Sequence, residues 1–193
     1  MAVFKLLESD NAALQVKLED CNSELNREEI KNNLIETMQA YEGIGLSANQ
    51  IGVLERVFIM YDASTLDSID KKVIACFNPK VISESVNTVM IEEGGCLSYP
   101  GLWIKVTRPE SIGVEYEDEN GKVTRDNLNG LQCRIFQHEY DHMEGSDFTK
   151  KVSKLKLDMA IKKQKKMDKL AKKLKDRTEA RLERDRQNQI LMS

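Results

Sequence analysis

His138-Glu139-Tyr140-Asp141-His142 contains both histidines of this 193-residue chain, four residues apart, with a glutamate directly after the first. Residues i and i+4 of an α-helix lie on one face, so both imidazoles can reach a single divalent ion. Glu139 lies beside them as a base for a metal-bound water. The pentapeptide therefore predicts a buried, metal-binding helix and a metal-dependent hydrolase.

A third protein ligand is required, and no histidine remains to provide it. Glu179 and Glu183 lie in a lysine- and arginine-rich stretch that is poor scaffolding for a rigid ligand. Cys96 is the better candidate, because the glycines of residues 92–101 let the backbone come close to an ion or a substrate. We expect Cys96 to be the third ligand. The other cysteines have no such surroundings: Cys21, Cys76 and Cys133.

Three segments of the chain resemble, in order, the motifs of the peptide deformylase family. They are GIGLSANQ at residues 43–50, GCLS at residues 95–98 and QHEYDH at residues 137–142, and the similarity covers roughly residues 1–149. One departure is visible: the family usually has Glu-Gly before the cysteine, whereas here Gly94 and Gly95 precede it and Glu93 is one place further away. A contact of that glutamate with the site is therefore in question, while the ligands are intact.

The resemblance implies an enzyme that hydrolyses the formyl group from the N-terminal formyl-methionine of nascent polypeptides and releases formate. The ion would lower the pKa of a bound water, and Glu139 would accept the proton of this water and pass it to the leaving amine. The family assigns the stabilisation of the tetrahedral oxyanion to the side-chain amide of Gln50 and the backbone N–H of Leu97.

The family also suggests where the substrate binds. Leu131 and Ile135 precede His138 by seven and three residues, so they share its helix face and can form a hydrophobic pocket for the methionine side chain, with Ile44 opposite. Gly45 and Gly95 have no side chain to obstruct a peptide that pairs with the backbone like a strand.

The type of metal does not follow from the ligands. Cysteine with two histidines suits zinc, yet deformylases commonly use ferrous iron, so we expect Fe2+, with Zn2+, Ni2+ or Co2+ as substitutes. Two alternatives differ from this function. One is a zinc endopeptidase with another third ligand, and the other is a binding module with a structural ion and a functional basic tail.

A charged partner of the helix is also expected near the ligands. Asp141 lies between the histidines, and Arg108 follows the cysteine segment at a position where the family tends to carry arginine. A buried carboxylate needs such a partner, whereas an exposed Asp141 would only decorate the helix.

The composition fits a cytoplasmic enzyme. A hydrophobic content of 40% is enough for a core, no apolar run approaches the length of a membrane span, and the N-terminus is too short and acidic a start for a signal peptide. We therefore expect no membrane association. Four scattered cysteines, one of them needed as a thiolate, indicate a reducing compartment without disulfides.

The charge is divided unevenly between two parts of the chain. Residues 1–149 contain 13 Lys+Arg and 26 Asp+Glu, whereas residues 150–193 contain 16 and 6. This change of composition is the only boundary that the sequence indicates. We expect a catalytic domain at residues 1–149 and a basic helical extension at residues 150–193.

Hydrophobic periodicity predicts an α+β fold, with mixed or antiparallel β-sheets around a central metal-binding helix and a long basic C-terminal helix. The central helix should run from about residue 128 to 143 and stop near Gly145, and another should start after Asn26, which with Glu29 resembles a capping box. The residues that recur at helical spacing in that first helix are Ile30, Leu34, Met38 and Tyr41. The expected strands cover residues 57–60, 73–77, 86–91, 102–106, 112–116 and 122–125, with a turn at Asn120-Gly121 before the last.

The basic extension should form one long helix with a thin apolar stripe. Its members are Val152, Leu155, Met159, Met167, Leu170 and Leu174. A solvated basic helix or a pairing with another helix would explain this pattern. The alternative is electrostatic binding of RNA, which suits an enzyme whose substrate emerges at the surface of the ribosome.

Overall fold

The described part of the chain forms seven β-strands and three α-helices. The computed structural model describes residues 2–191. The α-helices are α1 (Arg27–Ala40), α2 (Gly130–Met143) and α3 (Lys154–Leu191). The strands are β1 (Gly45–Ser47), β2 (Val57–Tyr61), β3 (Val73–Glu84), β4 (Thr88–Glu93), β5 (Ile104–Pro109), β6 (Ser111–Glu117) and β7 (Val123–Asn129). The described residues also form four short 3-10 helices, the first of them before α1: η1 (Ala12–Gln15), η2 (Ala48–Ile51), η3 (Ala63–Thr65) and η4 (Phe148–Lys151).

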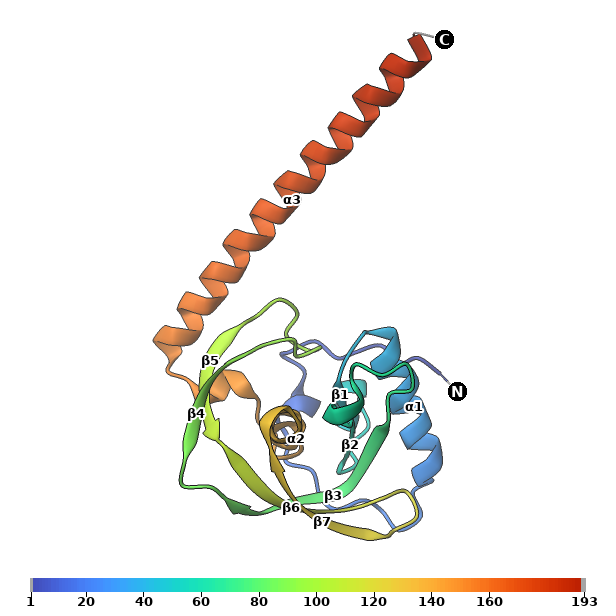
Figure 1. The fold of residues 1–193 in the computed structure, drawn as a ribbon, viewed down its shortest axis with the longest axis vertical. Coiled ribbons are helices and arrows are strands. Elements are labelled where there is room, and N and C mark those ends of the chain that lie inside the picture. Colours follow the sequence, from blue (N-terminus) through green and yellow to red (C-terminus); the bar gives the residue numbers. More distant parts are fainter. Residues whose placement is uncertain (1, 192–193) are drawn as a thin grey trace.

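The strands form two antiparallel sheets that curve around α2, which is seen nearly end-on in the middle of Figure 1. One sheet has five strands in the order β1-β2-β3-β6-β7, and the other is the hairpin β4-β5. Every pairing between named strands is antiparallel. The expected α+β class, with sheets around the helix of the histidines, is confirmed.

Helix α2 is buried because apolar side chains leave it in several directions. Phe136 makes an edge-to-face contact with Phe58 of β2, with ring centroids 5.1 Å apart, and Ile135 and Met143 belong to the same core cluster. Cys133 also packs there. A helix with apolar residues all round is stable only inside the protein, so α2 carries its polar face into the interior as well.

The C-terminal end of the buried helix is held by specific residues. Arg56 donates hydrogen bonds to the carbonyls of Leu18 and Met143, which satisfies an acceptor at the C-terminal end of α2, and it forms an ion pair with Glu144 at 2.6 Å. Gly145 follows with φ of 63°, as expected for a helix terminator.

Helix α1 begins as the sequence predicts and ends one residue earlier. The side chain of Asn26 accepts a hydrogen bond from the backbone N–H of Glu29. Ile30, Leu34 and Met38 are buried against the five-stranded sheet. The expectation for Tyr41 is wrong, because this residue is the C-cap and its side chain is exposed.

The expected strand positions are partly wrong. The two strands around the Cys96 loop begin two residues later than predicted, because Val86 and Trp103 lie outside the ladder that pairs Thr88 with Pro109. Strand β3 extends beyond residue 77 through a register shift at Asn78 and Pro79, an irregularity that tolerates a proline without an N–H donor. The strand β1 was not predicted, and residue 128 belongs to β7 rather than to α2.

The basic extension is one long helix, as predicted, and it projects from the body (Figure 1). Of the predicted stripe, Val152 packs on the body, but within the helix other residues make the contact. Val152, Leu157, Ala160 and Ile161 pack on the cluster around Phe148, whereas Leu155 and Met159 are 71% and 65% exposed. The prediction placed Leu155 on the contact face instead of Leu157. Both residues are leucine, so the composition does not distinguish them. The distal members Met167, Leu170 and Leu174 are exposed.

No helix within residues 2–191 is long and apolar enough to cross a bilayer.

Gly145→Ala should lower the free energy of unfolding by about 2–3 kcal/mol. A Cβ at residue 145 would lie 2.6 Å from the backbone carbon of Val16 and 2.7 Å from the backbone nitrogen of Lys17, where the N-terminal segment crosses the end of α2. Urea denaturation measures the loss. Gly121→Ala is the control, because its φ is also positive but only the end of the Arg27 side chain lies within 4 Å, so about 1 kcal/mol is expected. Equal losses in the two variants would contradict the role of the backbone contact.

Candidate active site

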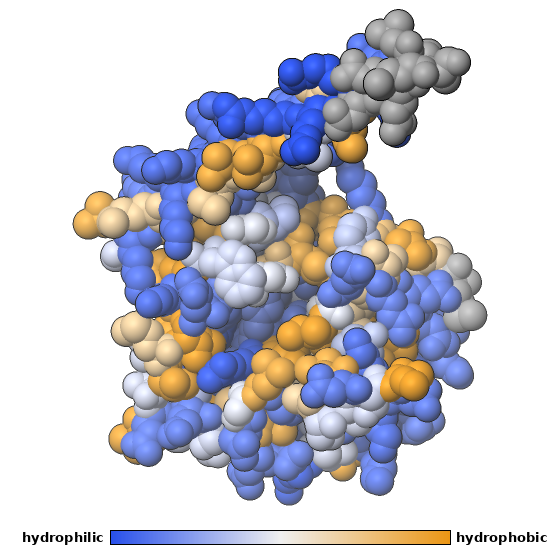
Figure 2. Space-filling view, turned by 45° about the horizontal axis from the view of Figure 1, so that its top comes forward, coloured by the Kyte–Doolittle hydropathy of each residue, from blue (hydrophilic) through white to orange (hydrophobic). Residues whose placement is uncertain are grey.

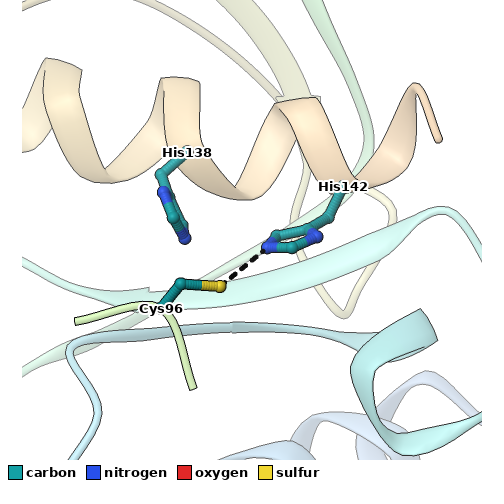
Figure 3. Close-up of side chains that lie close together, drawn as sticks. All are labelled: Cys96, His138 and His142. Atoms are coloured by element: carbon teal, nitrogen blue, oxygen red, sulfur yellow. Dashed lines mark hydrogen bonds between the residues drawn. The ribbon is translucent and has the colours of Figure 1, made fainter. Parts of the chain in front are cut away.

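Three side chains from two parts of the chain meet beside α2. Cys96 comes from the loop after β4, and His138 and His142 come from successive turns of α2 (Figure 3). Their candidate ligand atoms all lie within 4.8 Å of one another, and Cys96 Sγ is 3.5 Å from His142 Nε2. The structure thus brings together the three residues that the sequence predicts as ligands. The thiol and the imidazoles are donors that suit a divalent transition metal.

The loop of Cys96 is shaped by its own backbone hydrogen bonds. The N–H of Tyr99 donates to the carbonyl of Cys96 at 2.9 Å, and the N–H of Leu102 donates to the carbonyl of Tyr99 at 3.2 Å. Gly101 has φ of 75°, a conformation that glycine adopts without strain. These two turns bring the chain from β4 to β5 and direct the thiol of Cys96 toward α2.

His138 is oriented by Glu93, the last residue of β4. Its Nδ1 lies 2.7 Å from Glu93 Oε1, which directs the other ring nitrogen toward Cys96. Glu93 also accepts two hydrogen bonds from the guanidinium of Arg108, at 2.5 and 2.6 Å. Burial acts to raise the pKa of Glu93, but the hydrogen bonds from Arg108 and His138 outweigh it and hold this pKa at about 2. Glu93 is therefore an anion that fixes the ring of His138, a candidate ligand.

The shifted motif left it open whether this glutamate contacts the site. The structure shows that Glu93 does so, through His138. Gly94 and Gly95 separate Glu93 from Cys96, and Glu93 reaches His138 from the end of the strand. The extra glycine is accommodated in the loop, so the ligand keeps its position.

The predicted partnership of Arg108 and Asp141 is also present. Arg108 Nη2 lies 2.9 Å from Asp141 Oδ2, and Lys151 Nζ lies 2.9 Å from the other carboxylate oxygen. Arg108 is buried, so its positive charge depends on the two carboxylates that face it. Through this arginine, β4, β5 and α2 are held in one arrangement.

Glu139 differs from the other carboxylates, because no cation is paired with it among the described residues. Its side chain is buried, and Oε2 has no hydrogen-bond partner within residues 2–191. Burial raises the pKa of Glu139 to about 7. A carboxylate with a pKa near neutrality can both accept and return a proton.

Gly45 has a further effect on the site besides its predicted one. A Cβ at residue 45 would lie 2.5 Å from Glu139 Oε1, so the glycine makes room for the Glu139 carboxylate, while its role beside a peptide stays a prediction. Gly45 lies on β1, the edge strand of the five-stranded sheet. Gly95 has φ of 75° and nothing within 4 Å of a Cβ position, which agrees with the open surface expected there.

Gln50 is held in a fixed orientation by its neighbours. Its Oε1 accepts hydrogen bonds from the backbone N–H and the hydroxyl of Ser47, at 3.1 and 2.9 Å. Its Nε2 therefore points to the cysteine loop, 3.1 Å from Ser98 Oγ and 3.9 Å from Cys96 Sγ. The N–H of Leu97 donates no hydrogen bond to any group in residues 2–191. Both expected oxyanion donors thus lie next to Cys96.

A cavity of about 270 Å³ opens beside these groups. Glu139, Cys96 and His138 line it together with apolar side chains. Ile135 is buried, whereas Ile44 and Leu131 are about 45% exposed and therefore lie toward its mouth. All the residues predicted for catalysis and binding line this cavity, except His142. The apolar lining residues are Ile44, Ile91, Leu97, Trp103, Leu131 and Ile135.

The protonation of the two histidines indicates a site for a cation. Burial lowers the pKa of His142 to about 3, and the charge of His138 acts in the same direction, so His142 is a neutral donor. Burial also opposes a proton on His138, but hydrogen bonds with Cys96 and Glu93 raise the pKa of His138 well above its ordinary value. The carboxylate of Glu93 thus favours positive charge beside the three donors, and a donor set of one thiol and two imidazoles fits a divalent ion.

A Cys-His-His group that can hold a divalent ion, with a free carboxylate beside it, defines the protein as a metallohydrolase. The family model described as polypeptide deformylase matches residues 3–158. The chain therefore belongs to the peptide deformylase family, whose members are metallohydrolases that remove the formyl group from the N-terminus of nascent chains, and it has this activity.

Relatives and solved structures agree with this assignment. A peptide deformylase of Rickettsia prowazekii is 32% identical over 174 residues, which cover 86% of this chain and 97% of the relative. A peptide deformylase of Rhizobium meliloti is 40% identical over 132 residues, 68% of this chain and 74% of the relative. The crystal structure of a peptide deformylase from Legionella pneumophila has a TM-score of 0.76 at 32% identity and covers 88% of this chain and 98% of its own. That of Ehrlichia chaffeensis, in complex with actinonin, has a TM-score of 0.74 at 32% identity, with coverages of 86% and 98%.

Several residues of the site are not apparent from sequence patterns. Asn49 donates a hydrogen bond to the carbonyl of His142 at 2.8 Å, and Ser98 accepts one from Gln50. Arg134 lies four residues before His138, a spacing that could have placed it on the pocket face. No local signal indicates Trp103, because its place depends on a partner across the β4-β5 hairpin.

Glu93→Ala should weaken metal binding about 10- to 100-fold, because His138 loses the group that orients it. The same change leaves Arg108 with one carboxylate fewer, so the free energy of unfolding should fall by about 3–5 kcal/mol. Metal content after dialysis against a chelator and urea denaturation measure the two effects. Glu92→Ala is the matched control, because Glu92 is adjacent but exposed. If both variants lose metal equally, Glu93 does not orient the ligand.

Proposed function

We propose that Cys96, His138 and His142 hold the divalent ion of this deformylase and that Glu139 is its general acid and base. The observation that supports this most strongly is the buried Oε2 of Glu139, which has no partner within residues 2–191 and faces the same cavity as Cys96 and His138. A buried carboxylate oxygen without a partner is costly unless a bound molecule supplies a proton or a hydrogen bond.

The chemistry can be assigned to individual groups of the chain. When bound, a divalent ion supplies a water of lowered pKa and polarises the formyl oxygen. Glu139 takes a proton from the attacking water and returns it to the amine nitrogen as the C–N bond breaks. Gln50 Nε2 and the Leu97 N–H donate to the oxygen that becomes negative, and removal of one such donor typically costs about 2.7–4 kcal/mol of transition-state stabilisation.

The substrate is proposed to enter with its methionine side chain in the apolar part of the cavity. Ile135 and Leu131 form one wall and Ile44 the other, as the sequence predicts. The peptide backbone would lie between Gly95 and the outer edge of β1, where Gly45 lies and where no strand pairs within residues 2–191. Pairing with a sheet edge recognises backbone, so most sequences can follow the methionine.

Ferrous iron is the ion that we propose, with zinc, nickel and cobalt as substitutes, since a cysteine and two histidines accept all four. A cytoplasmic location is part of the same proposal. It is supported by the four unpaired cysteines, one of which must remain a thiolate in order to bind the ion. We also propose residues 1–149 as the catalytic part of the chain and residues 150–193 as an extension.

Glu139→Gln should reduce formate release from a formyl-methionyl peptide by at least about 100-fold, because general acid-base catalysis contributes on this order. Metal content, measured by plasma emission, should stay near that of the wild type. Cys96→Ser is the comparison, since an alcohol replaces a thiolate ligand and metal should be lost. Loss of metal from Glu139→Gln to the extent seen in Cys96→Ser would contradict the assignment of a base. Cleavage of a blocked internal peptide by the wild type would instead favour the endopeptidase alternative.

The basic helix is proposed to bind ribosomal RNA. Every residue from 165 to 182 is exposed, and the segment from 150 onward carries 16 Lys+Arg against 6 Asp+Glu. A helix of this kind neutralises phosphates and releases counterions, so binding would fall steeply with salt. Residues 192 and 193 of the extension lie outside the described residues.

The packing of the helix decides where it should be cut. Leu157 and Ile161 pack on the cluster that contains Cys96, and Gln164 donates a hydrogen bond to the carbonyl of Pro100 at 2.6 Å. Removal of residues 150–193 would therefore disturb the loop of Cys96 as well as the distal part of the helix.

Removal of residues 166–193 should leave formate release within about twofold of the full chain and reduce co-sedimentation with ribosomes at low salt. Reversal of Lys166, Lys169 and Lys173 to glutamate in the full chain should have the same effect without shortening the helix. Ribosome binding that is equal in all these proteins at low salt would reject the role of the helix.

A further inference from the structure

Trp103 is a large apolar side chain that stays exposed at the mouth of the active-site cavity. It lies just before β5, lines the cavity and is 56% exposed. It is the only tryptophan of the chain. An exposed indole at a binding cavity is a frequent anchor for ligands, because it offers a rigid apolar surface at small cost in conformational entropy.

The indole of Trp103 lies directly against the backbone of Gly94, the residue that stands where the family usually has the glutamate of the cysteine motif. A Cβ at residue 94 would lie 2.3 Å from Trp103 Cδ2 and 2.5 Å from Cε3. Only a glycine at this position lets the ring lie over the end of β4. Gly94, the extra residue between Glu93 and Cys96, thus leaves the space that the ring of Trp103 occupies. Glu93 keeps its contact with His138.

The other side of the turn before Trp103 is also fixed. Gln164 of α3 donates to the carbonyl of Pro100, and a Cβ at Gly101 would lie 3.2 Å from its Nε2. The face of the body beneath the long helix is hollowed and carries hydrophobic residues (Figure 2). Trp103 is therefore attached to a supported turn at the cavity, which favours a preformed binding surface.

The proposed direction of the substrate determines what reaches this surface. The formyl group lies at the ligands and the methionine side chain lies among the apolar residues of the cavity, so the following residues must leave through the mouth. The half-exposed apolar side chains there are Ile44, Leu131 and Trp103. Glu92 and Arg134 line the cavity with opposite charges, so the mouth does not favour a charged side chain of one sign.

We propose that Trp103 is a specificity-determining residue, which receives an apolar side chain of one of the two residues after the formyl-methionine. This inference rests on the substrate orientation of the proposed function. Successive side chains of an extended peptide point to opposite sides, so only one of the two positions meets the indole. Burial of a leucine on this surface should raise kcat/KM about fivefold over serine.

Three peptides test this inference with the metal-loaded full chain: formyl-Met-Leu-Ser, formyl-Met-Ser-Leu and formyl-Met-Ser-Ser. One of the two leucine peptides should exceed formyl-Met-Ser-Ser about fivefold in kcat/KM, and Trp103→Ala should reduce this ratio below about twofold. Trp103→Phe should keep most of it. Met90→Ala is the control, because Met90 is exposed on β4 but does not line the cavity. It should retain the ratio of the wild type.

Fluorescence gives a readout that a merely structural residue would not move. Because the chain has one tryptophan, a blue shift of its emission when the preferred peptide binds to Glu139→Gln reports on Trp103 alone. Equal kcat/KM for the three peptides, a ratio that survives in Trp103→Ala, or an unchanged emission would overturn the proposal. Failure to release formate from any of the peptides would count against the catalytic assignment itself, and so the two failures can be told apart.

Discussion

The ion pair between Arg108 and Glu93 connects the parts of the chain that form the site. Cys96 belongs to the loop between β4 and β5, whereas both histidines belong to α2, so nothing in the local sequence fixes their distance. Arg108 on β5 bridges Glu93 and Asp141, and Glu93 in turn contacts His138. A buried arginine tolerates little displacement, because each lost carboxylate leaves charge without compensation in a medium of low dielectric constant. The β4-β5 hairpin is thereby held in one position against α2.

The two glutamates beside His138 show how this arrangement separates structural from chemical roles. Glu93 faces a cation and stays ionised, with a pKa of about 2, whereas burial without a cation brings the pKa of Glu139 to about 7. They are the same residue type in similar burial. Opposite environments make one of them a permanent anion that orients His138, and give the other the pKa that its proposed role in proton transfer requires.

Local patterns predicted the helices, and the side chains of the two histidines that meet Cys96, because this information is contained in a few consecutive residues. The spacing of His138 and His142 and the cap at Asn26 are examples. Features that depend on distant partners could not be predicted. The contact of Glu93 with His138 depends on the path of a loop with one extra glycine. The position of Trp103 depends on its neighbour Gly94. The helix α3 docks with Leu157 and Ile161 rather than with Leu155 and Met159, because the docking face depends on the distant cluster around Phe148, and both faces carry apolar side chains.

The length of α3 sets a distance between anchoring and catalysis. At a rise of about 1.5 Å per residue, its 38 residues span about 57 Å, and the part beyond residue 165 lies clear of the body (Figure 1). If ribosomal RNA is held by that distal part, as proposed, it would act through local concentration rather than through the transition state. An extended peptide covers the same 57 Å with about 17 residues. In that proposal the helix would serve as a spacer, which would let one anchored enzyme sample chain ends over a distance of this size.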